Sequence, residues 1–475
     1  MGEQVGEQHE AAGVVTEADD VGARIAARLS QRRSANLTVA SARVLPAGAS
    51  RATYLVALSG DTDEQIIVRA VPSARSDDGG LAVEADILTA AASAGVPVPA
   101  VLDAGLDPAT SVLGYPYIVM NFVAGESIPR RILRDETYSA ARGRFVEQAG
   151  GILARIHQMD RHAVGRLSEM PDPLGALAEL FPREWAQMPA GLVLATRWLE
   201  HNRPEPSPSS TVVHGDFRLG NLLIDAEGVA AVLDWELAHV GDPVEDLGWL
   251  CAKAWRFSAP DPVAGMGARA DLLDAYEKVA GWRPTDQALR WWELYATVRW
   301  GLICAVQANR HLDGTERSVE LAAIGRRSAE QEFDALLDLG LVTPEAVADP
   351  LHTMSAGPED PYGPPSAPDL LASVAEFLRS APVNENMAAH IKFHTRVAAN
   401  VVDVVRRQLL TAPEALPASA SRLHDLGVAD QRDLVAGLRD GSIDGDDPAV
   451  RAAVVADVRA RLLVANPRYF AVPHP

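Results

Sequence analysis

Apolar residues cluster or alternate in short runs through the first quarter of the chain, a pattern typical of β-strands. Turn-forming residues separate these runs, and the predicted strands cover residues 37–48, 53–60, 66–70 and 116–125. A single helix is expected over residues 81–95, where Leu81, Ile87 and Leu88 are apolar and Gly95 suits a helix C-terminus. The pattern predicts a small sheet with one helix.

The pattern becomes helical beyond residue 125. Within residues 136–160, apolar side chains recur at helical spacing and fall on one face, namely Phe145, Ala149, Ile152, Leu153 and Ile156. Residues 285–311 predict a long, very apolar helix. Between these helices, three short strands are expected over residues 211–216, 221–225 and 230–235. A small β-rich lobe followed by a larger helical lobe is a bilobal α+β fold.

The two ends of the chain differ from this core. Residues 1–20 are polar and acidic without apolar periodicity, so we expect a disordered tail. Pro, Gly and Ser are dense in residues 352–366, which favours a linker. Helical patterns follow, and Asp447 with Pro448 is a suitable start for the last helix. We therefore expect three ordered domains: an N-lobe over residues 21–123, a C-lobe over residues 124–351 and an all-helical domain over residues 367–475.

Composition and charge restrict the partners and the compartment. The chain has 475 residues, of which 48% are hydrophobic and 23% are charged, the balance of a soluble globular protein. Its net charge of −21 argues against a nucleic-acid partner. No apolar run reaches the roughly 18 residues needed to cross a bilayer, and the N-terminus lacks the basic and apolar regions of a secretion signal. Cys251 and Cys304 lie in apolar stretches and are expected to be buried free thiols, which fits a cytoplasmic protein.

One segment contains residues from which a chemistry can be predicted. Asp216 is followed five positions later by Asn221 and thirteen positions after that by Asp234. Phosphoryl transfer needs a carboxylate that orients and deprotonates the attacking hydroxyl, and oxygen ligands that hold Mg²⁺ against a triphosphate. These three side chains supply one base and two metal ligands. Because a hairpin is predicted between residues 221 and 235, Asn221 and Asp234 are expected at its open end. Arg218 lies in the same loop and could neutralise charge on the transferring group.

The stretch HGDFRLGN followed by VLDWE resembles the catalytic and metal-binding loops of the aminoglycoside phosphotransferase-like family, distant relatives of the protein kinases. Gly215 stands where protein kinases have Arg, and Trp235 and Glu236 stand where they have Phe and Gly. The resemblance implies a protein-kinase-like fold. It also implies an ATP- and Mg²⁺-dependent kinase that phosphorylates a hydroxyl group of a small molecule.

The same resemblance implies roles for individual residues of the catalytic segment. Asp216 and Arg218 would be catalytic, together with His214, which would orient the loop by hydrogen bonding. Asn221 and Asp234 would be the metal ligands.

The N-terminal segment resembles the same family. The sequence LPAGASRATY, around Gly48 and Ser50, is similar to the family's nucleotide-covering loop. Arg69 occupies the place of the kinase lysine, and Glu84 is its expected ion-pair partner. Since Arg binds phosphate bidentately, this replacement is compatible with the same reaction class. The hinge that hydrogen-bonds adenine through backbone groups would consist of Met120, Asn121, Phe122 and Val123.

The acceptor is not encoded in a readable motif. The motifs look most like the kinase module fused to some acyl-CoA dehydrogenases, which implies a hydroxyacyl-CoA or a related metabolite, and the C-terminal helices resemble an uncharacterised bacterial domain. An aminoglycoside or amino-sugar kinase is one alternative, for which Asp242, Glu245 and Asp246 are the only nearby acidic run. A catalytically silent nucleotide-binding scaffold is another. The oligomeric state and the choice between ATP and GTP stay open, and neither nucleic acid nor a membrane is expected as a partner.

Overall fold

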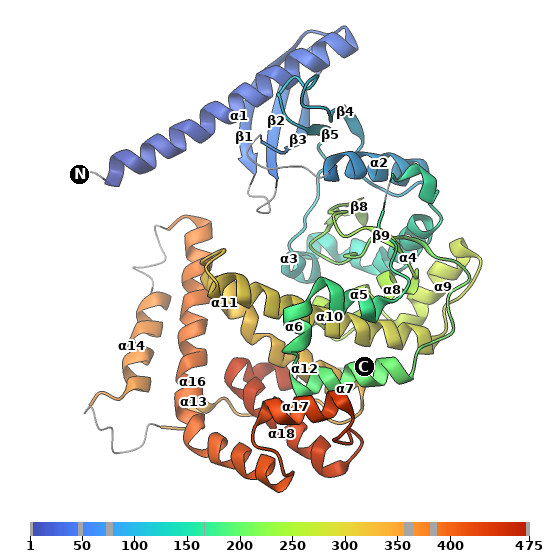
Figure 1. The fold of residues 1–475 in the computed structure, drawn as a ribbon. Helices are drawn as coiled ribbons and strands as arrows, with labels where there is room; N and C mark the ends of the chain where they lie inside the picture. The colour runs from blue at the N-terminus through green and yellow to red at the C-terminus, as the bar shows by residue number, and fades with distance from the viewer. Residues whose placement is uncertain are drawn as a thin grey trace. The chain divides into compact units, whose positions relative to one another are not determined.

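A computed structural model of the protein describes residues 3–45, 51–72, 79–165, 167–355, 364–380 and 387–471, with side chains from residue 17 onward except at residue 389. The chain divides into two compact units. Unit 1 comprises Met1–Met170, Pro206–Asp246 and Met266–Pro284, and unit 2 comprises Pro171–Glu205, Leu247–Gly265 and Thr285–Pro475. Figure 1 shows the helices and strands of both.

Unit 1 begins with a five-stranded antiparallel sheet in the order β1-β2-β3-β5-β4. Its strands are β1 (Leu37–Leu45), β2 (Ala52–Gly60), β3 (Glu64–Ala70), β4 (Val101–Gly105) and β5 (Tyr117–Asn121), with helix α2 (Gly80–Ser93) between β3 and β4. The four predicted strands and the predicted helix are therefore confirmed. Strand β4 was not predicted, because it is only five residues long and has Asp103 at its centre.

Helix α1 (Glu3–Arg33) covers one face of this sheet (Figure 1). Its buried side chains recur at a spacing of three or four residues and pack on alternate residues of β2 and β3; they are Ala18, Val21, Ile25, Ala26 and Leu29. The side chain of Tyr54 in β2 donates a hydrogen bond of 2.8 Å to Glu17. The disordered tail expected over residues 1–20 is thus corrected for residues 3–20, which belong to α1. Its described buried side chains run from Ala18 to Leu29, across the boundary predicted at residue 20.

The rest of unit 1 contains short helices and two small sheets. The helical elements are α3 (Pro129–Arg134), η1 (Glu136–Tyr138), α4 (Ser139–His157), η2 (Arg161–Ala163), α9 (Arg269–Ala280) and the start of α8 (Val244–Cys251). Strands β7 (Leu222–Ile224) and β8 (Val229–Val232) form an antiparallel hairpin, which confirms the predicted one. Strand β6 (Thr211–Val213) pairs with β9 (His239–Gly241).

Unit 2 is helical in its described residues. It contains α5 (Pro173–Leu180), α6 (Pro182–Ala186), α7 (Ala190–His201), η3 (Lys253–Arg256), α10 (Asp286–Leu312), α11 (Val319–Arg326), α12 (Ser328–Asp338), α13 (Pro350–Thr353), α14 (Ala367–Arg379), α16 (Ala389–Asp425), α17 (Gln431–Asp440), α18 (Pro448–Ala465) and η4 (Pro467–Ala471). As predicted, Asp447 caps α18 by accepting a hydrogen bond from the backbone of Ala449, and Pro448 is its first residue. The two cysteines, Cys251 and Cys304, are free and buried, as expected.

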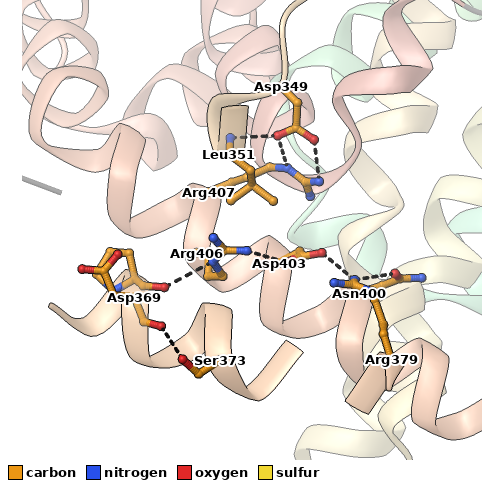
Figure 2. A network of polar contacts seen from close by, with 10 residues as sticks. Asp349, Leu351, Asp369, Ser373, Arg379, Asn400, Asp403, Arg406 and Arg407 are labelled. Atoms are coloured by element: carbon orange, nitrogen blue, oxygen red, sulfur yellow. Dashed lines mark hydrogen bonds and ion pairs between the residues drawn. The ribbon is translucent and has the colours of Figure 1, made fainter. Parts of the chain in front are cut away.

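A polar network ties α16 to its neighbours within unit 2 (Figure 2). Arg407 donates to both carboxylate oxygens of Asp349 at 2.8 and 2.9 Å, and the same carboxylate caps the backbone N–H of Leu351. Arg406 donates to the carbonyl of Pro368 at 3.2 Å and to Asp403 at 3.0 Å. Bidentate Arg–carboxylate pairs fix orientation as well as distance, so the start of α13 is held firmly against α16, and a single hydrogen bond from Arg406 joins the start of α14 to the same helix.

The C-terminal helices do not form a compact unit of their own, contrary to the expected separate domain over residues 367–475. They belong to unit 2, where α12 carries buried carboxylates whose partners come from the C-terminal segment. Arg461 of α18 pairs with Glu332, and the Tyr469 hydroxyl donates to Asp334 at 2.6 Å. A buried charge requires a partner, so this packing follows from charge placement that a pattern of apolar residues does not reveal. None of the described helices is long and apolar enough to cross a membrane.

Candidate active site

The loop after β6 holds the Asp216 carboxylate between two donors. The Arg218 guanidinium donates through Nε to Oδ1 at 2.9 Å, and the Asn221 amide donates through Nδ2 to Oδ2 at 2.6 Å. The same amide also donates to the Asp216 carbonyl at 3.0 Å. The Asp216 side chain is 14% exposed, so it is held in one orientation while still reaching solvent. This arrangement can present a carboxylate to a hydroxyl group.

The hairpin brings Asn221 and Asp234 together, as the sequence predicts. The backbone N–H of Leu233 donates to the Asn221 carbonyl at 2.8 Å, directly after the last paired residues of β7 and β8. Asp234 follows with a φ of 64°, in the left-handed region that non-glycine residues seldom adopt. The backbone turns there so that the three polar residues of the predicted site share one end of the hairpin.

The donor chemistry of this site suits Mg²⁺. Because Asn221 uses its Nδ2 on Asp216, its amide oxygen is the atom left to bind a cation. The Asp234 carboxylate makes no hydrogen bond or ion pair with another residue in the described part of the chain. One amide and one carboxylate oxygen match the small protein contribution that Mg²⁺ takes beside phosphate and water. The described residues also contain no cluster of three or more His, Cys, Asp or Glu side chains that could hold a metal.

His214 is buried and both of its ring nitrogens are occupied. Nδ1 accepts the backbone N–H of Asp216 at 3.1 Å, and Nε2 lies 3.0 Å from the carbonyl of Leu233, to which it donates. Burial lowers the pKa of His214 below its ordinary value of 6.5, although nearby carboxylates oppose the shift. The neutral ring therefore links the catalytic loop to the residue before Asp234, which is a positioning role and not that of a base.

The neutral state of His214 leads to a testable pH dependence. Because its folded-state pKa is lowered, the unfolded chain binds this proton more readily, and stability is lost as the pH falls below about 6.5. We expect the loss to approach ~1.4 kcal/mol per pH unit for this single site. Chemical denaturation between about pH 5 and 7 should show a shallower dependence in His214→Gln than in the wild type. The exposed His162 is the control, since His162→Gln should keep the wild-type slope; equal slopes in wild type and His214→Gln would contradict the account.

Asp246 fixes the same loop through its backbone. It was not predicted as a site residue. Its carboxylate accepts the backbone N–H of His214 at 2.8 Å and of Gly215 at 2.9 Å, and His157 Nε2 lies 3.2 Å away. Burial would raise the pKa of Asp246, but the hydrogen bond and charge of His157, together with the charge and the backbone N–H of His214, bring it below its ordinary value. The acidic residue considered as part of a substrate patch is therefore fully buried and internally engaged.

Gly215 is required by the shape of the loop. Its φ is +79°, and a Cβ at this position would lie 2.4 Å from the backbone oxygen of Leu237. We expect Gly215→Ala to lower the free energy of unfolding by roughly 2–5 kcal/mol, through left-handed strain and overpacking together. Gly114→Ala is a matched control, because Gly114 has a φ of +78° but no atom within 4 Å of its added Cβ. Equal effects of the two substitutions in thermal unfolding would refute the steric part of this explanation.

The sheet contributes a second charged cluster. Arg69 of β3 pairs with Glu84 of α2 through Nη1, as predicted, and Arg51 pairs with the other carboxylate oxygen of Glu84 at 2.5 Å. Arg51 was not predicted, although it lies within the motif compared with the nucleotide-covering loop. Gly48 and Ser50 lie outside the described residues.

The predicted adenine hinge is an edge where strand pairing ends. Met120 is buried and pairs with Ile67 of β3, and the side chain of Asn121 accepts the backbone N–H of Ala100 at 2.5 Å. Phe122 is 40% exposed, and its N–H donates to the Gln65 carbonyl at 3.0 Å. The main chain of Val123 makes no hydrogen bond within the described part of the chain. Its N–H and C=O are thus available for hydrogen bonds to adenine. The role of these residues as the adenine hinge stays a prediction.

Comparison with known proteins gives two matching family models. The phosphotransferase enzyme family (APH) matches residues 41–282, about half of the chain. A domain of unknown function (DUF6285) matches residues 385–469.

Curated relatives are much longer than the region they share with this chain. Acyl-CoA dehydrogenase family member 10 of Mus musculus is 33% identical over 227 residues, which are 43% of this chain and 19% of that protein. Acyl-CoA dehydrogenase family member 11 of Homo sapiens is 30% identical over 168 residues, 33% of this chain and 20% of that protein. The chain therefore spans about a fifth of the length of these relatives.

A solved structure supports the fold. The crystal structure of a candidate aminoglycoside phosphotransferase from Ralstonia eutropha JMP134 aligns with a TM-score of 0.53 and 22% identity, over 67% of this chain and 97% of that one. This likeness confirms the predicted α+β, protein-kinase-like fold class. With the family match over the segment that contains the Asp216 loop and the hairpin, the chain belongs to the phosphotransferase enzyme family.

Proposed function

We propose that the protein transfers the γ-phosphoryl group of ATP to a hydroxyl group of a small molecule, with Mg²⁺ as the metal. The observation that carries this proposal is the position of Asp216. Its carboxylate is oriented by Arg218 and Asn221, and Asn221 is joined through a backbone hydrogen bond to the residue before Asp234. A base and two metal ligands at one end of a hairpin are what phosphoryl transfer requires of a protein.

Each of these groups has a distinct task in the proposed reaction. Asp216 accepts the hydrogen bond of the acceptor hydroxyl and takes its proton as the oxygen attacks phosphorus. Arg218 lies beside that carboxylate and offsets negative charge on the transferring group. Asn221 and Asp234 would hold Mg²⁺, which supplies charge neutralisation on the triphosphate when bound. Arg69 binds phosphate oxygens while paired with Glu84.

The acceptor that we favour is a hydroxyacyl-CoA or a related metabolite. Support comes from the likeness to acyl-CoA dehydrogenase family members 10 and 11, together with the phosphotransferase family match of this chain. The two buried thiols are compatible with a reducing cytoplasm.

The aminoglycoside or amino-sugar alternative requires an acidic surface for a polycation. The three acids considered for that surface are engaged inside unit 1. Asp246 is buried against the catalytic loop, Glu245 lies 3.2 Å from His239, and Asp242 accepts from Ser207 at 2.8 Å. Their engagement favours an acceptor that is not a polycation.

The test is ATP consumption by the purified protein with a panel of hydroxyacyl-CoAs, amino sugars and aminoglycosides. Turnover that depends on a hydroxyacyl-CoA supports the proposal. Turnover that depends on an aminoglycoside or amino sugar would show that the acceptor belongs to that class and not to the hydroxyacyl-CoAs. ATP binding without turnover on any acceptor would favour the silent scaffold.

A further inference from the structure

Glu84 is shared by two arginines in unit 1. Arg69 contacts one carboxylate oxygen through Nη1, and Arg51 contacts the other through its own Nη1 at 2.5 Å. The Glu84 side chain is only 7% exposed, whereas those of Arg51 and Arg69 are 16% and 21% exposed. One buried carboxylate thus lies between two guanidinium groups that reach the surface.

The strand register places both arginines on the same face of the sheet. Arg69 pairs with Thr53 across β2 and β3, and Arg51 lies two residues before Thr53. Arg51 directly precedes β2, and an extended chain there would point it to the side of Thr53; its contact with Glu84, which Arg69 shares, agrees with this. The strand neighbours of Thr53 and Arg69, Tyr54 and Val68, are buried on the opposite face in the cluster that includes α1. The two arginines therefore project away from α1.

The charges of this cluster do not cancel. Two guanidinium groups and one carboxylate leave an excess of one positive charge, although burial raises the pKa of Glu84 and the two arginines oppose that shift. Each guanidinium has five N–H donors, and the Nε of Arg69 is buried without a hydrogen-bond partner among the described residues. A buried donor without a partner is costly unless a ligand supplies an acceptor.

The cluster lies within electrostatic reach of the catalytic hairpin. The charge of Asp234 contributes to the raised pKa of Glu84, after burial as the larger cause, while Arg69 and Arg51 act in the opposite direction. The excess positive charge is therefore near the carboxylate that would hold the metal of a nucleotide complex.

We infer that Arg51 and Arg69, bridged by Glu84, form a two-arginine site for the polyphosphate of the nucleotide. The inference rests on the proposed function and adds Arg51 to its binding residues. A lysine offers one point charge, whereas two guanidinium groups offer several N–H donors in fixed planes to neighbouring phosphate oxygens. The site should therefore distinguish nucleotides by their phosphates: ATP and ADP gain from Arg51, and adenosine does not.

The test is calorimetric titration of Mg-ATP, Mg-ADP and adenosine into the full-length protein and its Arg51→Gln variant. We expect Arg51→Gln to weaken ATP and ADP by about 10- to 100-fold, the usual effect of a lost charge-assisted hydrogen bond, and to leave adenosine unchanged. Arg51→Lys, which keeps the charge beside Glu84, should weaken ATP less and serves if Arg51→Gln does not fold. Arg33→Gln removes an exposed ion pair to Glu64 elsewhere in unit 1 and should leave all three affinities unchanged.

A second background separates phosphate binding from simple neutralisation of Glu84. If Arg51 only neutralises that carboxylate, Arg51→Gln will have no effect on ATP binding once Glu84→Gln has removed the charge, and the inference is overturned. If Arg51 binds phosphate, Arg51→Gln will still lower the affinity for ATP by about 10-fold in the Glu84→Gln background. An equal loss of ATP and adenosine, or wild-type ATP affinity in Arg51→Gln, would also overturn it. Wild-type protein that binds no nucleotide would instead refute the proposed function itself.

Discussion

Replacing Asp216 by Asn should lower the acceptor-dependent turnover rate by about 10²- to 10⁴-fold, the usual contribution of a positioned general base. The amide has nearly the shape of the carboxylate but cannot take the proton of the acceptor hydroxyl. The loss should fall on kcat, since Asp216 is oriented by Arg218 and Asn221 and is not itself one of the metal ligands proposed here. Steady-state kinetics with the best acceptor of the panel, together with ATP titration, measure both quantities.

Asp225→Asn is the matched control for this substitution. Asp225 is an exposed carboxylate in the turn of the same hairpin, where it caps the backbone N–H groups of Glu227 and Gly228. An amide can accept the same hydrogen bonds, so turnover should remain near that of the wild type. If Asp216→Asn retained the turnover of Asp225→Asn, Asp216 would not be the base.

Lys253→Met should lower the free energy of unfolding by about 3–5 kcal/mol, the effect of removing one partner of a buried ion pair. The Lys253 ammonium lies 2.8 Å from Asp334, and the two side chains are 2% and 1% exposed. The same ammonium lies 4.4 Å from the ring centroid of Tyr469, whose hydroxyl donates to Asp334. Without Lys253, the carboxylate would be buried with Tyr469 as its remaining polar contact described here.

Arg310→Ala provides the comparison within unit 2. Arg310 pairs with Glu316, and these side chains are 37% and 46% exposed, so the pair should contribute no more than about 1 kcal/mol. Denaturant unfolding of both variants measures the difference directly. A cost for Lys253→Met as small as that for Arg310→Ala would contradict the view that this buried cluster holds the C-terminal segment to α12.

The hairpin that carries the proposed metal ligands could be predicted because its information is local. Asp216, Asn221 and Asp234 lie within one short segment, and the apolar runs of β7 and β8 flank a turn that leaves little choice of pairing. The apolar pattern likewise identified β2 and β3, and Arg69 lies on β3. In these elements, neighbouring residues in the sequence are also neighbours in the structure.

Residues whose role depends on distant partners could not be predicted. Asp246 is an acidic residue at the start of a helix, and only the fold shows that it accepts the backbone N–H groups of His214 and Gly215. The proposed phosphate contact of Arg51 depends on Glu84 of α2, which pairs with both Arg51 and Arg69. The position of the C-terminal helices follows from pairs such as Arg461 and Glu332, which are far apart in the sequence. The apolar residues of α1 between Ala18 and Leu29 have helical spacing. The predicted tail ended at residue 20, in the middle of this pattern, so the helix was not predicted.

The most direct test of the central claim is transfer of a labelled γ-phosphate from ATP to a hydroxyacyl-CoA, followed by mass spectrometry of the product. We expect the label in a phosphate ester on the acceptor hydroxyl, formed by wild-type protein and by Asp225→Asn and nearly absent with Asp216→Asn. Label released only as inorganic phosphate, or product formed equally by Asp216→Asn, would contradict the assignment of this site as a phosphotransferase centre with Asp216 as its base.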